Sequence, residues 1–432
     1  MSVSSLIREV FGIIRDFAYG FIGWLFLAPI AALVPKRRDW VAVIGRGDGK
    51  FLDNTKYFFI ESSLAADPKP RVVQVTERAD TLGWARNSGL EALAFPSFRS
   101  WWFLARCGTV VVDSVEWCER WRCFLLCRAQ KIQLWHGVGF KRIELNKWHN
   151  EARGRKLVSM PWLLYARLLR KRLRGRIPRY AAVVTTSEFY REEVFASAFR
   201  HQHLLAIGYP RNSFGQLSGL KGELARKNVD SQALKNLDGW RAQGRRIVLV
   251  APTFRDTRVT SLGLGGDQVR RLDTFCEEHG FEFVFKFHPY EKGSSRIGGR
   301  HLWVLDSNSD VYPLFPYFAA MVSDYSSIYM DFLLLDRPIF FLTPDLDEYI
   351  SRDRDIQFDF ESMTPGPKFS SWDALLEKLL QPEDEKWMRR RADLKLKAFD
   401  GIDQCDATRK LLEFACEQGW IKPSVVNLSQ VI

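Results

Sequence analysis

The feature that most constrains the fold is an alternation of short apolar runs with helical stretches, which occurs twice along the 432 residues. The first series predicts strands at 39–44, 71–75, 109–112, 131–135, 181–185 and 204–207. The second predicts strands at 246–250, 282–287, 302–305, 320–322 and 338–342. Such alternation is typical of a parallel α/β sheet, whose ligands sit at the carboxyl ends of the strands. The sequence therefore predicts two Rossmann-like α/β domains that face a central cleft.

The chain is longer than one hydrophobic core usually organises, which also favours two domains. We expect an N-terminal segment at 1–38, a first domain at 39–215, a second domain at 246–400, and a C-terminal helix and tail at 401–432. The stretch 216–245 is polar and rich in glycine and lysine, so we expect it to be a linker.

Residues 17–34 form an uncharged run that is followed by Lys36, Arg37 and Arg38. The run is short for a bilayer span, and Pro29 interrupts it. We expect a monotopic or hairpin-like membrane anchor that includes Trp24. A true span and a buried apolar helix are the alternatives.

A second candidate for membrane contact is the basic stretch 160–180. An excess of basic residues gives the chain a net charge of +12, which favours an anionic partner. The stretch is either a solvated helix face or an amphipathic element on anionic lipid, and we favour the lipid. The candidate lipid-binding residues here are Trp162, Arg170, Lys171, Arg172 and Arg174.

The odd number of cysteines, seven, favours a reducing compartment. Together with the candidate membrane contacts, it predicts the cytoplasmic face of the cell membrane.

The segment Gly45 to Lys50, GRGDGK, follows a predicted strand and invites comparison with nucleotide-binding loops. Its glycine spacing differs from the dinucleotide fingerprint, and Phe51 stands where a P-loop needs Ser or Thr. We therefore expect a tight turn.

His136 is the strongest candidate for a catalytic base. It directly follows an apolar strand and precedes Gly137, so its ring is expected to project from a strand end. Imidazole is the side chain best suited to take a proton from an alcohol near neutral pH. A structural histidine is the alternative.

The second domain offers a phosphate site. Thr253 and Arg255 follow one predicted strand, and His288 follows the next. The segment SDYSS opens a predicted helix, with Ser323 or Asp324 as its N-cap, and adds the hydroxyls of Ser326 and Ser327. A helix start with such groups can hold a phosphate. Simple capping of strand ends is the alternative.

The chain resembles the CDP-glycerol glycerophosphotransferases, which make teichoic acids and related capsule polymers. The resemblance rests on nine segments in family order over roughly residues 40–370. They are FLDNTKYFF, LWHGVGFKRI, TTSEF, GYPRN, APTFRD, FHP, SDYSSIYMDF, RPIFFLTPDLDEY and FDFESMTPGP.

The resemblance implies a GT-B fold, with an acceptor domain at 39–215 and a CDP-donor domain at 246–400. It implies transfer of glycerol phosphate or ribitol phosphate from a CDP-polyol to a lipid-linked or polymeric acceptor, without a metal or other cofactor. In this picture His136 is the general base and His288 contacts the donor phosphates. The other candidates are Thr253, Arg255, Lys286, Asp324, Ser326, Ser327 and Asp331 for the donor, and Gly137, Lys141 and Arg211 for the acceptor side.

One departure concerns the first motif. Many relatives have Thr, Pro and Leu where this chain has Val138, Gly139 and Phe140, which leaves the acceptor open. Two other functions compete: a GT-B glycosyltransferase that uses a nucleotide-sugar, and a non-catalytic membrane protein that binds polyanions. Nucleic acid is not an expected partner.

Overall fold

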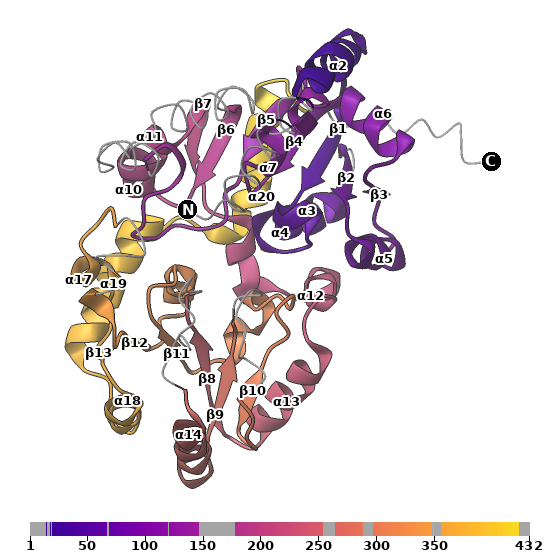
Figure 1. Cartoon of the computed structure of the whole chain (residues 1–432). Coiled ribbons are helices and arrows are strands. Elements are labelled where there is room, and N and C mark those ends of the chain that lie inside the picture. Colours follow the sequence, from indigo (N-terminus) through magenta and orange to yellow (C-terminus); the bar gives the residue numbers. More distant parts are fainter. Residues whose placement is uncertain are drawn as a thin grey trace. The chain divides into compact units, whose positions relative to one another are not determined.

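The computed structural model describes residues 14, 18, 20–66, 69–119, 121–146, 178–253, 264–287, 297–347, 349 and 356–422. The chain divides into two compact units (Figure 1). Unit 1 comprises Met1–His136, Ile143–Arg211 and Asp403–Ile432, and unit 2 comprises Gly137–Arg142 and Asn212–Ile402. The candidate residues Arg255 and His288 and the basic stretch around 160–177 lie outside the described residues.

Unit 1 is built on a parallel sheet in the order β3-β2-β1-β4-β5-β6-β7. The order reverses between β1 and β4, which makes this the topological switch point of a Rossmann-like sheet. Every residue of β4 is buried, as expected for a strand covered on both faces. The strands are β1 (Arg37–Ile44), β2 (Arg71–Thr76), β3 (Ala92–Ala94), β4 (Cys107–Val112), β5 (Gln130–Gln133), β6 (Arg179–Thr185) and β7 (Arg200–Ala206).

The helices of unit 1 include one from the end of the described chain. Helix α20 (Ala407–Glu417) packs against α4 (Asp53–Leu64), and the Thr408 hydroxyl donates to the Glu61 carboxylate. The final segment is thus part of unit 1. The other helices are η1 (Gly23–Leu27), α2 (Ala28–Leu33), α3 (Arg46–Gly49), α5 (Ala79–Asn87), α6 (Phe98–Arg106), α7 (Glu116–Glu119), η2 (Trp121–Phe124), α10 (Glu188–Tyr190), η3 (Arg191–Phe195), α11 (Ala196–Ala198) and η8 (Gln404–Asp406). The 3-10 helix η4 (Pro210–Gln216) runs from unit 1 into unit 2.

Unit 2 repeats the same plan with a second parallel sheet, in the order β10-β9-β8-β11-β12-β13. Its order reverses between β8 and β11. The strands are β8 (Arg246–Ala251), β9 (Phe281–Phe285), β10 (Leu302–Val304), β11 (Ala320–Ser323), β12 (Ile339–Leu342) and β13 (Lys368–Phe369). The helices are α12 (Gly219–Arg226), α13 (Ser231–Ala242), α14 (Gly266–His279), η6 (Tyr312–Tyr317), α15 (Ile328–Phe332), η7 (Leu333–Leu335), α17 (Phe360–Met363), α18 (Trp372–Leu379) and α19 (Glu385–Phe399).

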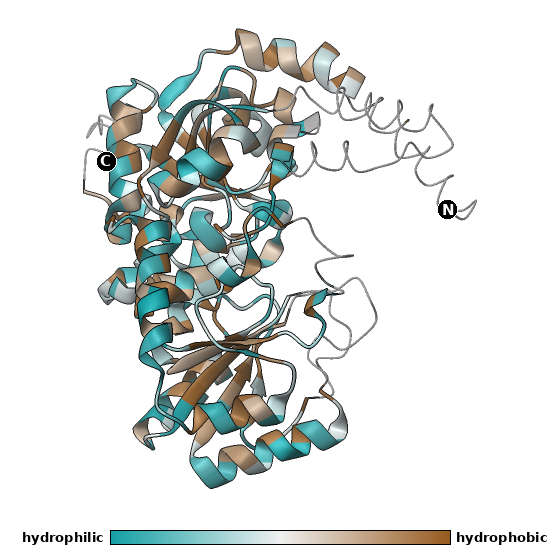
Figure 2. Ribbon diagram, turned by 90° about the vertical axis from the view of Figure 1, so that its left-hand side faces the viewer, coloured by the Kyte–Doolittle hydropathy of each residue, from teal (hydrophilic) through white to brown (hydrophobic). Residues whose placement is uncertain are grey.

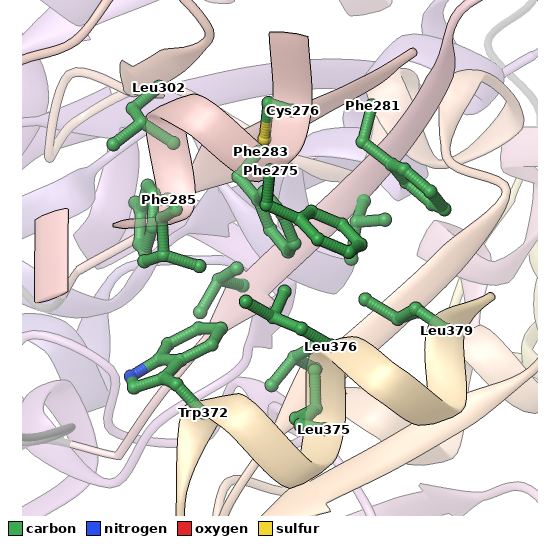
Figure 3. Packing of buried hydrophobic residues seen from close by; sticks show 14 of the residues in the cluster. Phe275, Cys276, Phe281, Phe283, Phe285, Leu302, Trp372, Leu375, Leu376 and Leu379 are labelled. Atoms are coloured by element: carbon green, nitrogen blue, oxygen red, sulfur yellow. The ribbon is translucent and has the colours of Figure 1, made fainter. Parts of the chain in front are cut away.

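One hydrophobic cluster of unit 2 fixes α14 and α18 on its sheet (Figure 3). Phe275 and Cys276 of α14 pack on Phe283 and Phe285 of β9, and Trp372 of α18 meets Phe283 edge to face. Figure 2 shows the strands of this sheet as hydrophobic and the outer sides of the helices as hydrophilic. This packing holds the sheet whose carboxyl edge carries the candidate donor residues.

The parallel sheets confirm the α/β class predicted from the sequence. The short strands β3 and β13 were not predicted. The prediction of a linker at 216–245 is wrong, because the segment is largely helical. Helices α12 and α13 occupy it, and the Asp230 carboxylate caps α13 by accepting from the backbone N–H groups of Gln232 and Ala233. Gly219, Lys221 and Gly222, which suggested a linker, lie in α12. The two helices bury Leu224 and Leu237 on one side.

At the N-terminus, residues 20–33 are helical and pack on the rest of unit 1 by a narrow side of small residues. Gly23 and Ala31 are buried, whereas Trp24 is 61% exposed. Among the described residues, no helix combines the length and apolar character needed to cross a bilayer.

Candidate active site

The candidate site of unit 1 lies at the switch point of its sheet. Arg46 follows β1, Asp113 follows β4 and His136 follows β5, and these three strands are neighbours. Because all three run parallel, their carboxyl ends bring these residues to one edge.

The hydrogen bond made by His136 fixes which ring nitrogen carries the proton. Its Nδ1 lies 2.9 Å from the backbone carbonyl oxygen of Asp113. A carbonyl oxygen only accepts, so Nδ1 donates and Nε2 keeps its lone pair. Burial, reinforced by the positive charge of Arg46, lowers the pKa of His136 to about 4. The ring is therefore neutral near pH 7 and able to accept a proton.

Asp113, whose backbone carbonyl binds this histidine, also carries a buried carboxyl group. Its side chain accepts from the Arg46 backbone N–H at 2.8 Å and from the Thr55 hydroxyl at 2.9 Å. Burial, together with the nearby Asp53 carboxylate, raises the pKa of Asp113 to about 7. Asp113 was not a candidate from the sequence, although it follows the apolar run 109–112 as His136 follows 131–135.

Asp53 and two arginines form a buried ionic cluster in the same place. Asp53 is 4% exposed and pairs with Arg46 at 2.6 Å and Arg211 at 2.8 Å. Burial by itself would raise the pKa of Asp53, but the two guanidinium groups outweigh it and hold the pKa below its usual value. Neither Asp53 nor Arg46 was a candidate from the sequence.

The segment GRGDGK forms the expected tight turn. Gly47 and Asp48 adopt positive φ angles of 60° and 65° inside the single turn α3. The Gly47 N–H donates to the Glu116 carboxylate at 2.9 Å, so the turn is fastened to the segment after β4.

In unit 2, Thr253 and Asp324 meet at the corresponding switch point, after β8 and β11. One Asp324 oxygen accepts from the Thr253 N–H at 2.7 Å and from the Thr253 hydroxyl at 2.8 Å. It also accepts from the N–H groups of Tyr325 and Ser326. Asp324 thus organises the loop that carries Ser326.

The expectation that Ser323 or Asp324 caps the following helix is wrong. Helix α15 begins at Ile328, its N-cap is Ser327, and no side chain caps it. Asp324 lies too early because three residues of loop separate it from the helix. Ser327 is exposed and Ser326 is half-buried, so both remain candidates for donor contact.

Two other donor candidates have partners inside unit 2. Lys286 donates through Nζ to the backbone oxygens of Asp306 and Ser307, both at 2.9 Å, and so ties the ends of β9 and β10 together. Asp331 is 1% exposed and accepts from the Tyr312 hydroxyl at 3.1 Å. These contacts indicate that Lys286 and Asp331 support the carboxyl edge of the sheet, which we call its rim.

The segment Gly137–Arg142 belongs to unit 2, although His136 belongs to unit 1. Phe140 is fully buried and packs edge to face on Phe360 at 5.4 Å between ring centroids. Lys141 forms an antiparallel bridge with Ile356, and its Nζ lies 5.4 Å from the centroid of the Tyr349 ring. Phe140, one of the residues that depart from the relatives, is thus a packing anchor.

The comparisons with known proteins point to one family. The family model described as CDP-glycerol:poly(glycerophosphate) glycerophosphotransferase matches residues 26–415. The teichoic acid ribitol-phosphate polymerase TarK of Staphylococcus aureus is 26% identical over 57% of this chain, which spans 45% of that polymerase. The teichoic acid ribitol-phosphate primase of Bacillus spizizenii is 24% identical over 78% of this chain and 81% of its own length.

A similarity in fold extends over nearly the whole chain. A solved structure of a variant of the wall teichoic acid polymerase TagF matches with a TM-score of 0.66 and 19% identity, covering 97% of this chain and 98% of that one.

Proposed function

Because the chain belongs to the CDP-glycerol:poly(glycerophosphate) glycerophosphotransferase family, we propose that it transfers a polyol phosphate from a CDP-polyol to an acceptor hydroxyl and releases CMP. The polyol is glycerol or ribitol, the acceptor is lipid-linked or polymeric, and the product is a teichoic acid-like or capsule polymer. The observation that carries this proposal is a neutral histidine, His136, with a defined tautomer at the switch point of an α/β sheet.

The proposed reaction needs one base and a site for charge. The acceptor oxygen attacks the β-phosphorus of the donor while its proton passes to Nε2 of His136. The new O–P bond forms as the bond from that phosphorus to the CMP oxygen breaks. Phosphoryl transfer depends mainly on positioning and on stabilising charge. We propose that no metal takes part, since Arg255 and His288 can supply cationic or hydrogen-bonding groups.

We propose a GT-B arrangement in which unit 1 binds the acceptor and unit 2 binds the donor. The rim of unit 2 supports this, since the loop held by Asp324 presents Ser326 and the exposed Ser327 after β11. We assign the donor phosphates to this loop together with Thr253, Arg255 and His288.

The reaction is tested by incubating the purified protein with a lipid-linked acceptor and CDP-glycerol, CDP-ribitol or UDP-sugars. CMP release from a CDP-polyol supports the proposal. Release of UDP without CMP would identify a glycosyltransferase, and release of neither would favour a polyanion-binding protein.

The assigned base is tested by His136→Ala. We expect the variant to lose at least 100-fold in kcat, because general base catalysis contributes about 10²–10⁴-fold. Donor binding, measured by calorimetry with CDP-glycerol, is expected to remain. The control is His279→Ala, at the surface end of α14. Transfer at the wild-type rate by His136→Ala would remove the assignment.

We also propose that the protein works at the cytoplasmic face of the membrane. The exposed Phe and Trp side chains among the described residues all lie on two neighbouring segments, residues 20–33 and α6. Aromatic side chains beside basic ones are typical of an interfacial membrane contact. The exposed aromatics are Phe21, Trp24, Phe26, Phe98, Trp101 and Trp102.

Flotation with phosphatidylglycerol vesicles tests this contact. The double change Trp24→Ser and Phe26→Ser is expected to reduce the fraction of protein bound to vesicles several-fold. In the wild type, each of these aromatic side chains favours binding because the membrane removes its apolar surface from water. The control is Leu396→Ser, which removes an exposed leucine from α19 of unit 2. Equal binding of the double variant and the wild type would move the contact to the stretch 160–180.

A further inference from the structure

The backbone around His136 is strained. Trp135 has a φ of 56°, a conformation that is an outlier for a bulky residue, and Gly137 has a φ of 142°. Such a conformation persists only where its surroundings over-determine it. The direction of the His136 ring therefore depends on what holds the backbone on either side.

Asn54 and Gln133 hold the Trp135 end of this turn. The Asn54 amide donates to the Trp135 carbonyl at 2.9 Å, and the Trp135 N–H donates to the Gln133 side chain at 2.8 Å. Asn54 lies in the first turn of α4 and is fully buried. These bonds fix the peptide group before His136.

Arg211 holds the other side. Its guanidinium donates from Nη1 to the His136 carbonyl oxygen at 2.9 Å and to the Asp53 carboxylate at 2.8 Å. Arg211 is 2% exposed, so it is a structural neighbour of the histidine and not an open acceptor-binding group. A buried guanidinium requires a buried counter-charge, and Asp53 provides it.

The position of Arg211 in the chain also links it to His136. His136 and Arg211 are each the last residue of unit 1 before the chain passes into unit 2. One hydrogen bond thus joins the two points where unit 1 ends. The Arg211 N–H also donates to the Asn54 side chain at 3.2 Å, so the same network holds both sides of the turn.

We propose that Arg211, with Asp53 as its counter-charge, is a positioning residue that sets the direction of the His136 imidazole. This rests on the proposed function, in which His136 is the base. A lysine retains the charge, but its ammonium ends a flexible stem, whereas in Arg211 the rigid guanidinium plane fixes the Nη1 that donates to both the carboxylate and the carbonyl. Misplacement of a catalytic group by about 1 Å costs on the order of 10²-fold in rate.

The test compares Arg211→Lys with Arg391→Lys. Arg391 is equally well buried, pairs with Glu383 in unit 2 and does not contact His136. We expect Arg211→Lys to lower kcat about 100-fold with little change in the KM for the CDP-polyol, and Arg391→Lys to leave kcat within a few-fold of wild type. An equal loss of kcat in the two variants, or a loss confined to KM, would overturn the proposal.

A second measurement does not need activity. NMR spectra of ¹⁵N-histidine-labelled protein resolve the two ring nitrogens, and His136→Gln identifies the His136 signals among the seven histidines. We expect the wild type to show a single tautomer with the proton on Nδ1, and Arg211→Lys to change the His136 signals alone. Unchanged His136 signals in Arg211→Lys would overturn the positioning role even if the wild type released no CMP.

Asn54→Ala provides a second variant should Arg211→Lys fail to fold, as judged by circular dichroism. It removes the amide that holds the Trp135 carbonyl and is expected to change the same His136 signals. A folded Asn54→Ala protein with wild-type His136 signals would contradict the network.

Discussion

The chemistry open to His136 depends on its neighbours at the level of single atoms. The Asp113 carbonyl oxygen accepts a hydrogen bond from the Nδ1 N–H, and burial keeps the ring neutral. A histidine of this kind gives up basicity, since a pKa of about 4 weakens its pull on a proton, but it is almost wholly in the form that can accept one. The site therefore contributes the orientation of the His136 ring and its removal from water.

The pH dependence of kcat/KM follows from these shifts. A lowered pKa keeps the base form present at lower pH, so loss of activity through protonation of His136 is expected near pH 4 and not near 6.5. An inflection near pH 7 is expected from Asp113, and it should vanish in Asp113→Asn. A pH–rate profile of the two proteins measures both. An acid limb near pH 6.5 that persists in Asp113→Asn would contradict the environment described for His136.

At the scale of elements, the sequence predicted most strands and the carboxyl-end placement of His136, Thr253 and Asp324. It could do so because buried parallel strands are continuous apolar runs. It did not reveal Asp53, Asp113 or Arg46 as part of the site, because their significance lies in contacts between segments far apart in the chain. Nor did it show that Lys286 and Asp331 make hydrogen bonds within unit 2.

The fit of the segment Gly137–Arg142 on unit 2 gives a prediction at this scale. A Cβ atom added at Gly139 would lie 2.9 Å from the Cβ of Ser327, closer than such atoms approach. Gly139→Val is expected to destabilise the protein by about 1–3 kcal/mol through overpacking, and to lower transfer by displacing the loop of Ser326. Thermal unfolding and CMP release measure the two effects.

The control for this change is Gly83→Ala. Gly83 lies in α5, and no atom would meet its added Cβ within 4 Å. Alanine there is expected to be neutral or stabilising by about 0.5–1 kcal/mol. Equal thermal unfolding midpoints for Gly139→Val and the wild type would show that the segment Gly137–Arg142 does not pack on Ser327 as described.

At the scale of the whole molecule, two units share one strand plan although the sequence shows no internal repeat. Each places its candidate residues where the strand order reverses, Asp113 in unit 1 and Asp324 in unit 2. The units differ in the part of the chain that supplies their last helix. Unit 1 takes its last helix, α20, from the chain beyond unit 2.

Ending the chain at residue 402 is therefore expected to destabilise unit 1. The truncation removes the buried side chains of Leu411 and Ala415 and the Trp420 carbonyl that accepts from Thr109 at 3.2 Å. Hydrogen exchange is expected to increase in β1 and α4 and to change little in β8 and β9. Adding a peptide of residues 403–422 should restore protection. Uniform protection in the truncated protein would contradict the role of α20.

The origin of α20 also has a consequence for synthesis. Residues 212–402 of unit 2 emerge from the ribosome before α20 does. At about 5–20 residues per second, the nascent first unit waits roughly 10–40 s for its last helix. During that interval the side of α4 that α20 later covers is open to solvent. Unit 1 is therefore expected to complete its fold only after residue 417, the end of α20, has left the ribosome.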